Sequence, residues 1–443
     1  MTKISVKNLG KIRAAEIETA PLLLFVGRNN TGKSYLATLM WSLAYLMPLL
    51  ATDEARERRP AWFKKVSIPK KDQKVVSLGV DRKAADDVIK YLNEELALGG
   101  SDFLSYNFSF DGFSNTEISI GVDEFDDFSI TLLVSDLGDA DNKVKFLGST
   151  YFDREGKSYL RTNFPLNSTI AENRAKDRVF MEIVGRVIYG RSWMLVRNTI
   201  YIPAARTGLM VALRALVSNL FEGDETSTVD LPRPFRDFLQ KMAVPRGRLS
   251  VTAPGPAVVQ WLEKEILNGH ILASDDEVPS FTYIPDGSKL VVPLHAASSM
   301  VTELAPFSVL LRSRGATQII FEEPEAHLHI SAQRSMARAL ARLVNGGYRV
   351  LVTTHSDTFV QQINNLMTLH AHPRRDEMLK KLGYEIEDLI DPRLAGAYEF
   401  VPDGKMTAVR KVHQRSEGFV VKSLNETLID LADETISIGE SDE

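Results

Sequence analysis

The stretch GRNNTGKS, at residues 27–34, decides the fold. It matches the pattern G-x-x-x-x-G-K-[ST], follows the short apolar run 21–26 (PLLLFV), and precedes a segment with the character of a long helix. In such a loop the glycines allow a tight turn, the backbone N–H groups point at phosphate oxygens, and the helix adds its dipole. A strand, this loop and a helix in succession therefore predict a phosphate-binding site rather than a chance glycine-rich turn.

The side chains at the end of this loop have the chemistry that a nucleoside triphosphate requires. We expect Lys33 to place its ammonium between the β- and γ-phosphates, and the Ser34 hydroxyl to ligate magnesium. The predicted ligands are therefore ATP and Mg²⁺. The candidate binding residues are all eight of the loop: Gly27, Arg28, Asn29, Asn30, Thr31, Gly32, Lys33 and Ser34.

Two adjacent carboxylates end a second apolar run, TQIIFEE at 317–323, which reads as a buried strand. Paired acids at a strand tip are costly unless a cation offsets them. We expect Glu322 to bind magnesium, directly or through water, and Glu323 to orient and deprotonate the attacking water. The alternative, a solvated strand end with two incidental acids, accounts poorly for the PEAHLH string that follows at 324–329.

A histidine stands at the tip of a third apolar run, in VLVTTHSD at 350–357. There His355 can reach a γ-phosphate or hold the catalytic water. A lone histidine at a strand end is more often structural, so this interpretation depends on the two preceding motifs. Taken with them, His355 is predicted to sense the γ-phosphate.

In this order, the loop, IIFEEPEAHLH (319–329) and VLVTTHSD resemble the ABC-type ATPases of the SMC, RecF and OLD group. More narrowly, they resemble a bacterial "ATP-binding protein" family that also carries YIPAARTGLM (201–210) and a serine-rich segment. The resemblance runs from residue 3 to about residue 412. It implies an α/β P-loop NTPase with an ABC-type core, in which helices flank a mostly parallel sheet.

The resemblance also implies that two such ATPase heads meet around nucleotide. The turn 323–329 (EPEAHLH) would lie at that interface, and Ser298 and Ser299 would replace the ABC signature and cap the partner's γ-phosphate. Met300 stands where the family usually has glycine, and an ordinary helix N-cap by Ser298 or Ser299 is the alternative.

Three assignments stay open on the sequence. His327 and His329 could suggest a metal site, but no third ligand is evident, so an interface role is preferred. Gln73 fits poorly as the glutamine that completes magnesium coordination in ABC heads, because it lies in a charged loop. Arg206 could face the nucleotide or lie on a helix surface.

Strands that alternate with helices after residue 317 indicate a parallel sheet. The predicted core is discontinuous, covering residues 1–50 and 190–412, with a β-rich and helical insertion at 51–189 and a C-terminal helix with an acidic tail at 413–443. The first helix is expected from Lys33 to about Met47, where Pro48 ends it. Asp-Gly pairs at 286–287 and 403–404 predict two hairpins.

The insertion shows two further patterns. Residues 53–65 (DEARERRPAWFKK) are highly charged and read as a solvated surface segment. Period-two alternation in NFSF (107–110), TEISIGV (116–122) and DFSITLLV (127–134) predicts strands of one antiparallel sheet.

Composition excludes several classes of function. The chain of 443 residues has no cysteine, which excludes disulfides, thiolate nucleophiles and Cys-ligated zinc. Its 53 basic and 58 acidic residues give a net charge of −5, which shows no overall preference for nucleic acid but does not exclude a local basic face. The longest uncharged run, 35–52, begins inside the loop motif and holds Pro48, so a buried helix is preferred over a membrane span.

The leading functional hypothesis is a cytoplasmic ATPase that dimerises around ATP and drives a separate effector, such as a nuclease or toxin. A role in bacterial anti-phage defence follows only by analogy. The alternative is a DNA-clamping ATPase of RecF or SMC type, and a third hypothesis is a scaffold that barely hydrolyses ATP. No D-x-D pair follows His355, so a fused nuclease of the OLD kind is not expected.

Overall fold

The computed structural model describes residues 2–66, 75–137, 144–152, 158–165, 169–213, 230–244, 254–276, 278–313 and 316–440. The chain forms two compact units, which we describe separately. The core unit comprises Asn8–Ser42, Leu104–Phe113 and Asn198–Glu443. The inserted unit comprises Met1–Lys7, Leu43–Phe103 and Ser114–Arg197.

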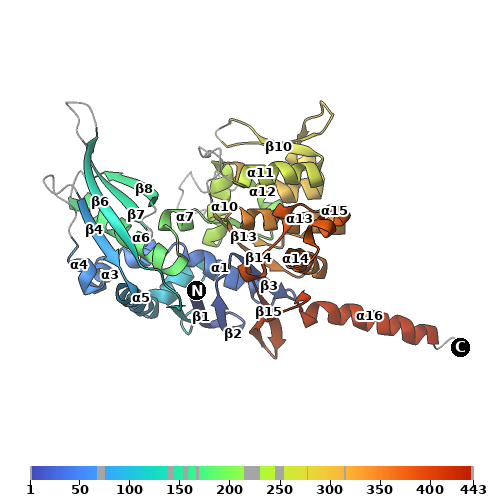
Figure 1. Ribbon diagram of the computed structural model, residues 1–443, viewed down its shortest axis with the longest axis horizontal. Helices are drawn as coiled ribbons and strands as arrows, with labels where there is room; N and C mark the ends of the chain where they lie inside the picture. The colour runs from blue at the N-terminus through green and yellow to red at the C-terminus, as the bar shows by residue number, and fades with distance from the viewer. Residues whose placement is uncertain are drawn as a thin grey trace. The chain divides into compact units, whose positions relative to one another are not determined.

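A mostly parallel sheet organises the core unit, with strand order β2-β16-β15-β3-β14-β13-β9 (Figure 1). Within this order only β15 and β16 pair antiparallel, while β16–β2, β15–β3, β3–β14, β14–β13 and β13–β9 are parallel. The strands are β2 (Ile12–Glu18), β3 (Leu22–Gly27), β9 (Ile200–Ile202), β13 (Gln318–Glu322), β14 (Arg349–Thr354), β15 (Ala395–Asp403) and β16 (Met406–Val412). All of β3 is buried, as expected for a strand covered on both faces. The predicted α/β class is confirmed.

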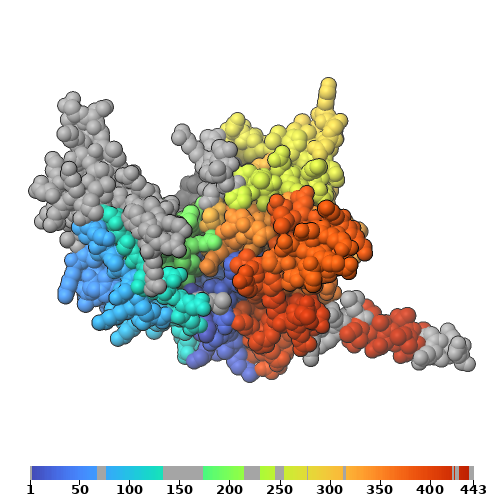
Figure 2. All heavy atoms as spheres, in the orientation of Figure 1, coloured from blue at the N-terminus to red at the C-terminus, as the bar shows by residue number. Residues whose placement is uncertain are grey.

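Helices cover this sheet and share one apolar core with it. Phe307 of one helix stacks on Phe321 of β13 with ring centroids 5.6 Å apart, and both side chains are fully buried. The helices of the core unit are α1 (Lys33–Leu43), α8 (Arg206–Val211), α10 (Arg233–Ala243), α11 (Pro254–Leu262), α12 (Ser299–Ser313), α13 (Ile330–Asn345), α14 (Asp357–His370), α15 (Arg375–Leu382) and α16 (Lys422–Glu440). The last of these, red in Figure 2, exposes Ile429, Leu431, Ile436 and Ile438.

Both predicted hairpins form. β11 (Phe281–Pro285) pairs with β12 (Val292–Pro293) and with β10 (Gly269–Ala273), although the loop that contains Asp286 and Gly287 is longer than two residues. In the second hairpin Asp403 of β15 pairs with Met406 of β16. Gly404, at φ 63°, therefore supplies the left-handed turn residue.

The inserted unit is built around a separate antiparallel sheet of order β4-β6-β7-β8. Its strands are β4 (Val75–Val80), β6 (Phe128–Leu137), β7 (Val144–Phe152) and β8 (Ser158–Pro165). A further antiparallel pair joins β1 (Thr2–Leu9) and β5 (Glu117–Val122). The helices are α2 (Met47–Leu50), α3 (Asp53–Arg58), α4 (Ala61–Lys64), α5 (Arg82–Phe108, whose last turn belongs to the core unit), α6 (Thr169–Tyr189) and α7 (Trp193–Arg197).

The strand predicted at NFSF is wrong, because α5 continues to Phe108. Buried Leu104 and Phe108 are four residues apart, as on one face of a helix, and Ser109 then reverses the chain at φ 58°. The segment TEISIGV does form a strand, β5, but it pairs with β1 and not with β6. Short alternating runs do not specify their pairing partner.

The charged segment 53–65 is not simply a solvated surface. It forms α3 and α4, and the Arg59 side chain is buried. Its guanidinium donates to Asp177 Oδ1 at 2.6 Å, and Arg56 bonds the same carboxylate through Nε and Nη2. The acidic partner lies more than one hundred residues away along the chain, so charge density alone did not reveal the contact.

The first helix ends at Leu43 rather than Met47. Pro48 does not end it but lies in the first turn of α2, where the fixed φ of proline is favourable. The uncharged run 35–52 is therefore divided between two helices. Within the described ranges, no helix has the length and hydropathy needed to cross a membrane.

A buried ion pair in the core unit gives a test of the fold. Asp388 is fully buried and accepts hydrogen bonds from Arg338 at 2.8 Å and Arg342 at 2.7 Å. Burial raises the pKa of Asp388, but these two guanidinium groups outweigh it and leave that pKa below its usual value. We predict that Asp388→Ala lowers the free energy of unfolding by about 3–5 kcal/mol, because Arg338 loses its carboxylate partner and Arg342 keeps only Glu385.

Urea denaturation of the full chain measures this difference. The matched control is Glu377→Ala, which breaks the exposed pair of Arg374 and Glu377 in the same unit. Its effect should stay below about 1 kcal/mol. Equal losses in the two variants would contradict the assignment.

Candidate functional site

The loop 27–34 joins β3 to α1, as the sequence predicted, and two glycines are required for its shape. Gly27 has φ 151°, and a Cβ there would lie 2.6 Å from the Phe400 carbonyl oxygen. Gly32 has φ 94°, and a Cβ there would lie 3.0 Å from Ile12 Cγ1. Both positions combine a backbone conformation that side chains disfavour with close packing, so the loop conformation depends on glycine.

Lys33 is held inside the loop. Its Nζ donates to the carbonyl oxygens of Gly27 at 2.7 Å and Arg28 at 2.8 Å, and its side chain is buried. Burial lowers the pKa of Lys33, whereas the carboxylates of Glu323, Glu325 and Glu322 act in the opposite direction. The positive charge therefore lies between the loop backbone and a group of acids.

A pocket of about 390 Å³ opens over this loop. Residues 29–35 line it together with Gly10, Lys11 and Glu323. The structure thus brings the second predicted carboxylate to the loop from a distant part of the sequence. Gly10, Lys11 and Tyr35 were not predicted. The only sequence signal for them was the Gly-Lys turn between two N-terminal strands and the position of Tyr35 directly after the motif.

Glu322 is buried at the end of β13 with one oxygen unsatisfied. Its Oε2 accepts from the Ala204 N–H at 3.1 Å, while Oε1 has no hydrogen-bond partner among the described residues. Burial raises the pKa of Glu322, whereas the nearby Ser34 and Tyr201 hydroxyls lower it. Neither hydroxyl makes a well-formed hydrogen bond to Oε1. A buried, unsatisfied carboxylate oxygen near the Ser34 hydroxyl fits the oxygen-donor set that Mg²⁺ prefers.

Glu323 and His355 meet at the strand ends. The Nδ1 atom of His355 lies 3.6 Å from Oε1 of Glu323 and 3.6 Å from Oε1 of Glu325. Contact with Glu323 raises the pKa of His355, with Glu325 adding to the rise and Lys33 opposing it. The same contact lowers the pKa of Glu323. Both predicted residues therefore belong to one charged group that adjoins the loop.

The sequence did not predict a role for Glu325 at the nucleotide site. In the structure, this residue binds the end of β14 and the backbone of His355 that follows it. Its buried Oε1 accepts from the Thr354 hydroxyl at 2.6 Å and from the His355 N–H at 3.0 Å. The signal was present in the string EEPEAH, where a third acid follows the first two after a proline. The direction of the Glu325 side chain could not be predicted, because the atoms that it binds lie at the end of another strand.

Ser298 and Ser299 are exposed at the start of α12 and do not line the pocket over the loop. The Val301 N–H approaches the Ser298 hydroxyl at 3.5 Å, which is a weak version of the N-cap alternative. Met300 packs partly buried against the core. The structure of one chain therefore does not bring these serines to the other predicted site residues.

The two histidines after the acids have separate roles. His329 Nδ1 lies 3.0 Å from the Ser331 hydroxyl and caps α13. His327 has φ 55°, and its Nε2 lies 3.8 Å from Oε1 of Glu303. Among the residues that the structure describes, no group of three His, Asp or Glu side chains could hold a metal ion.

Two positions that the sequence left open now have different outcomes. Arg206 is fully buried, so it is neither a surface residue nor part of the pocket lining. It contacts the backbone behind Glu322 and Glu323 instead. Gln73 lies outside the described residues.

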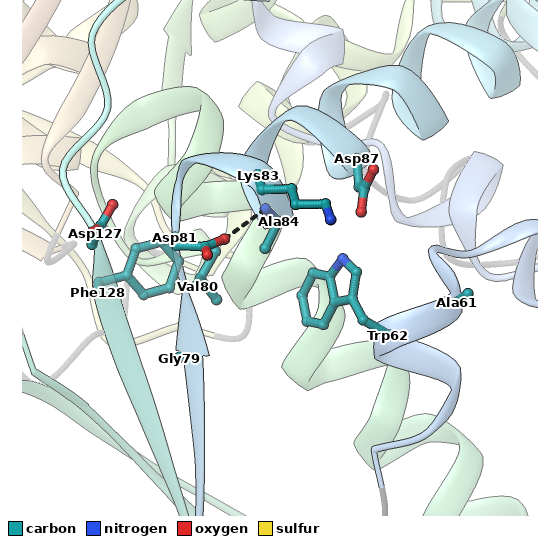
Figure 3. A pocket seen from close by; sticks show the side chains of 10 residues that line it. All are labelled: Ala61, Trp62, Gly79, Val80, Asp81, Lys83, Ala84, Asp87, Asp127 and Phe128. Carbon is teal, nitrogen blue, oxygen red and sulfur yellow. Dashed lines mark hydrogen bonds between the residues drawn. The ribbon is translucent and has the colours of Figure 1, made fainter.

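A second cavity, of about 680 Å³, lies within the inserted unit (Figure 3). Trp62 and Phe128 form apolar parts of its wall, and Asp81, Lys83 and Asp87 contribute charges. Asp81 accepts a hydrogen bond from the Ala84 N–H at 2.8 Å at the beginning of α5. None of the site residues predicted from the sequence lines this cavity.

The phosphate loop and the mostly parallel sheet define an α/β fold of the P-loop type, and one of the acids at the strand end lines the pocket over the loop. Residues 256–360 match the family described as AAA ATPase domain. The match confirms that this part of the chain resembles a nucleotide-binding ATPase domain, as the motifs indicated. A search of curated proteins gave no significant match.

Solved structures of SMC heads are similar at low identity. One, an SMC head bound to the C-winged helix domain of ScpA, is 11% identical with a TM-score of 0.38, over 93% of this chain and 96% of that chain. The SMC head domain from Thermotoga maritima is 10% identical with a TM-score of 0.34, over 93% and 98%. A Pyrococcus furiosus SMC head with an extended coiled coil, bound to the C-terminal domain of ScpA, is 12% identical with a TM-score of 0.36, over 98% and 100%.

The contact between His355 and Glu323 predicts a measurable titration. We expect His355 to titrate above its ordinary value of 6.5, and Glu323→Gln to lower that pKa because the neighbouring negative charge is lost. The contact should stabilise the fold fully below pH 6.5 and lose this contribution as the pH rises through the raised pKa. NMR titration of the imidazole resonances measures the shift, with His355→Gln identifying the signal. A titration at or below 6.5 in the wild-type chain would contradict the geometry.

Proposed function

We propose that this protein binds ATP with Mg²⁺ and hydrolyses it to ADP and phosphate. One observation carries the proposal: Glu323 lines the same pocket as the phosphate loop, while the unsatisfied oxygen of buried Glu322 lies near Ser34. The binding loop, the proposed magnesium donors and the carboxylate of Glu323 are then brought together in one site. The ATPase domain match supports nucleotide binding, and the geometry is the argument for hydrolysis.

Each residue has a distinct proposed role. The N–H groups of residues 27–34 and the ammonium of Lys33 bind the phosphates, and Ser34 and Glu322 hold Mg²⁺. When bound, the ion neutralises charge on the phosphate oxygens. Glu323 orients the attacking water and accepts its proton. His355, positioned by Glu325, contacts the γ-phosphate end of the site.

We further propose that two copies close around nucleotide and that this closure controls a separate effector in the cytoplasm, such as a nuclease or toxin. The exposed start of α12 supports the first step, because Ser298 and Ser299 are free to reach a second copy. The turn at His327 would lie at the same interface. The role in bacterial anti-phage defence rests on the family resemblance alone.

The first test replaces the proposed base. Glu323→Gln keeps the shape of the side chain and removes the proton acceptor, so hydrolysis should fall by about 10²–10⁴ while ATP binding persists. The variant should accumulate as an ATP-bound dimer, because hydrolysis no longer opens it. Single-turnover hydrolysis, nucleotide titration and gel filtration measure these three properties. Hydrolysis at the wild-type rate would place the base elsewhere.

Two matched variants separate binding from chemistry in the same assays. Lys33→Ala removes the loop's cation and should abolish or strongly weaken ATP binding itself. Glu322→Gln should weaken the magnesium dependence of binding. If Lys33→Ala kept wild-type affinity, the loop would not be the ATP site.

A second test addresses the shared site. Lys33→Ala and Ser299→Ala chains should each be inactive alone, since each dimer site needs both residues. Mixed dimers contain one site with both residues intact, so mixing should restore up to about half of the activity per mixed dimer. The measurement is ATPase activity after subunit exchange, with mixed dimers confirmed by two affinity tags. Absence of recovery in confirmed mixed dimers would rule out a cap from the second copy.

A further inference from the structure

Arg206, at the first position of α8, is a cation with no exposed surface. A buried guanidinium is costly unless its N–H groups are bonded and its charge is paired. Burial accordingly lowers the pKa of Arg206. Four nearby acids act in the opposite direction, and Glu303 has the largest effect among them. The contacts of Arg206 explain why a buried cation is present beside the proposed site.

Two of these contacts hold the backbone of Glu322, the proposed magnesium ligand, and of Glu323, the proposed base. Nη1 of Arg206 donates to the Glu322 carbonyl oxygen at 2.9 Å, and Nη2 donates to the Glu323 carbonyl oxygen at 3.0 Å. The guanidinium carbon also lies 5.0 Å from the ring centroid of Phe321, one residue earlier on β13. The planar fork of an arginine can bond both carbonyls at once, whereas a lysine ammonium cannot reproduce this geometry.

The backbone at Glu323 has a conformation that requires support. Its φ of 45° lies in the left-handed region, which non-glycine residues rarely adopt and which persists only when surrounding contacts hold it. On one side the Glu323 N–H donates to the Thr353 carbonyl oxygen of β14 at 2.9 Å. On the other side Arg206 binds its carbonyl oxygen. The two contacts together set the direction in which the Glu323 side chain leaves the strand.

Besides a bond from Nη1 to the Pro203 carbonyl oxygen at 3.3 Å, Arg206 makes contacts that join this backbone to α12. Nε of Arg206 lies 2.6 Å from Oε2 of Glu303 and donates to the Glu303 carbonyl oxygen at 3.2 Å. Glu303 is buried, one turn after Ser299, and its Oε1 accepts from the Thr207 hydroxyl. The same Oε1 is 3.8 Å from the ring of His327. One buried ion pair therefore connects the start of α12 and the 323–329 turn to the end of β13.

We propose that Arg206 is a positioning residue that sets the orientation of Glu323, and that the Arg206–Glu303 pair transmits displacements of α12 to that carboxylate. The inference rests on the proposed ATPase function. Arg206 contacts no reacting atom and acts through the carbonyls of Glu322 and Glu323. Since α12 and His327 lie where a second copy is proposed to dock, its arrival would align Glu323 through this pair.

Two variants test the proposal in the full-length chain. Arg206→Lys keeps a cation beside Glu303 but loses the fork that binds the two carbonyls. The double variant Arg206→Met/Glu303→Leu removes both charges, which avoids leaving one buried ion unpaired. The control is Arg338→Met, which removes another largely buried arginine, the partner of Asp388 in the same unit.

Turnover is measured as single-turnover hydrolysis per bound ATP, because unfolded protein binds no ATP and is then excluded from the rate. ATP affinity and the melting temperature are measured on the same samples. Both Arg206 variants should hydrolyse bound ATP about 10²-fold more slowly with ATP affinity nearly unchanged, because a displaced base costs rate rather than binding. The control should melt at a lower temperature and hydrolyse bound ATP at the wild-type rate. A merely structural Arg206 would behave like the control.

Wild-type turnover per bound ATP in both Arg206 variants would overturn the proposal. Lost ATP affinity in folded Arg206→Lys would also overturn it, since the effect would then lie on the phosphate loop. Glu323→Gln, assayed in parallel, separates this inference from the proposed function. If Glu323→Gln is inactive and the Arg206 variants are fully active, only the positioning role fails. If Glu323→Gln is fully active, the assignment of the base fails first.

Discussion

The parallel pairing of β3, β14 and β13 is the constraint on which the whole site depends. Val26 pairs with Thr354, and Thr353 pairs with Glu322, so the three strands end at one edge of the sheet. The residues that follow them are the phosphate loop, Glu323 and His355. Parallel strands present their carboxyl ends together, which is why α/β sheets bind ligands at that edge. A change of register in any of the three would separate the loop from the acids.

Buried charge is the second feature that organises this edge. Lys33, Glu322, Glu325 and Arg206 all have little or no exposed surface. Such a group is stable only if each member is paired or hydrogen-bonded, so the positions of its members depend on one another. Within the described residues, Glu322 and Glu325 each keep one unsatisfied oxygen, and the Glu322 oxygen, which lies near Ser34, is one that a divalent cation would satisfy. The arrangement therefore links metal and nucleotide binding to the geometry of the strand ends.

Sequence patterns succeeded where a residue's function depends on its immediate neighbours and failed where it depends on distant ones. The loop 27–34 needs only its own glycines, lysine and serine between a strand and a helix, so its position was predictable. By contrast, NFSF has the alternation of a strand and yet α5 ends within it, because buried Leu104 and Phe108 have helical spacing and Phe108 packs against Phe113 from beyond the helix. Arg59 belongs to a highly charged segment, and its burial depends on the distant residues Asp177 and Phe180, which the segment itself does not indicate.

By itself, the sequence determined the fold class, the phosphate loop, the two acids at the end of β13 and the histidine after β14. These features are local: apolar runs, glycines at fixed spacing and polar residues at strand ends. Only the tertiary structure decided that Glu323 lines the pocket of the loop, that Glu325 holds the backbone at His355, and that Arg206 is buried behind Glu323. Each of these depends on contacts between segments far apart in the chain, and the direction of a side chain across such a contact is set by strand order and packing rather than by neighbouring residues.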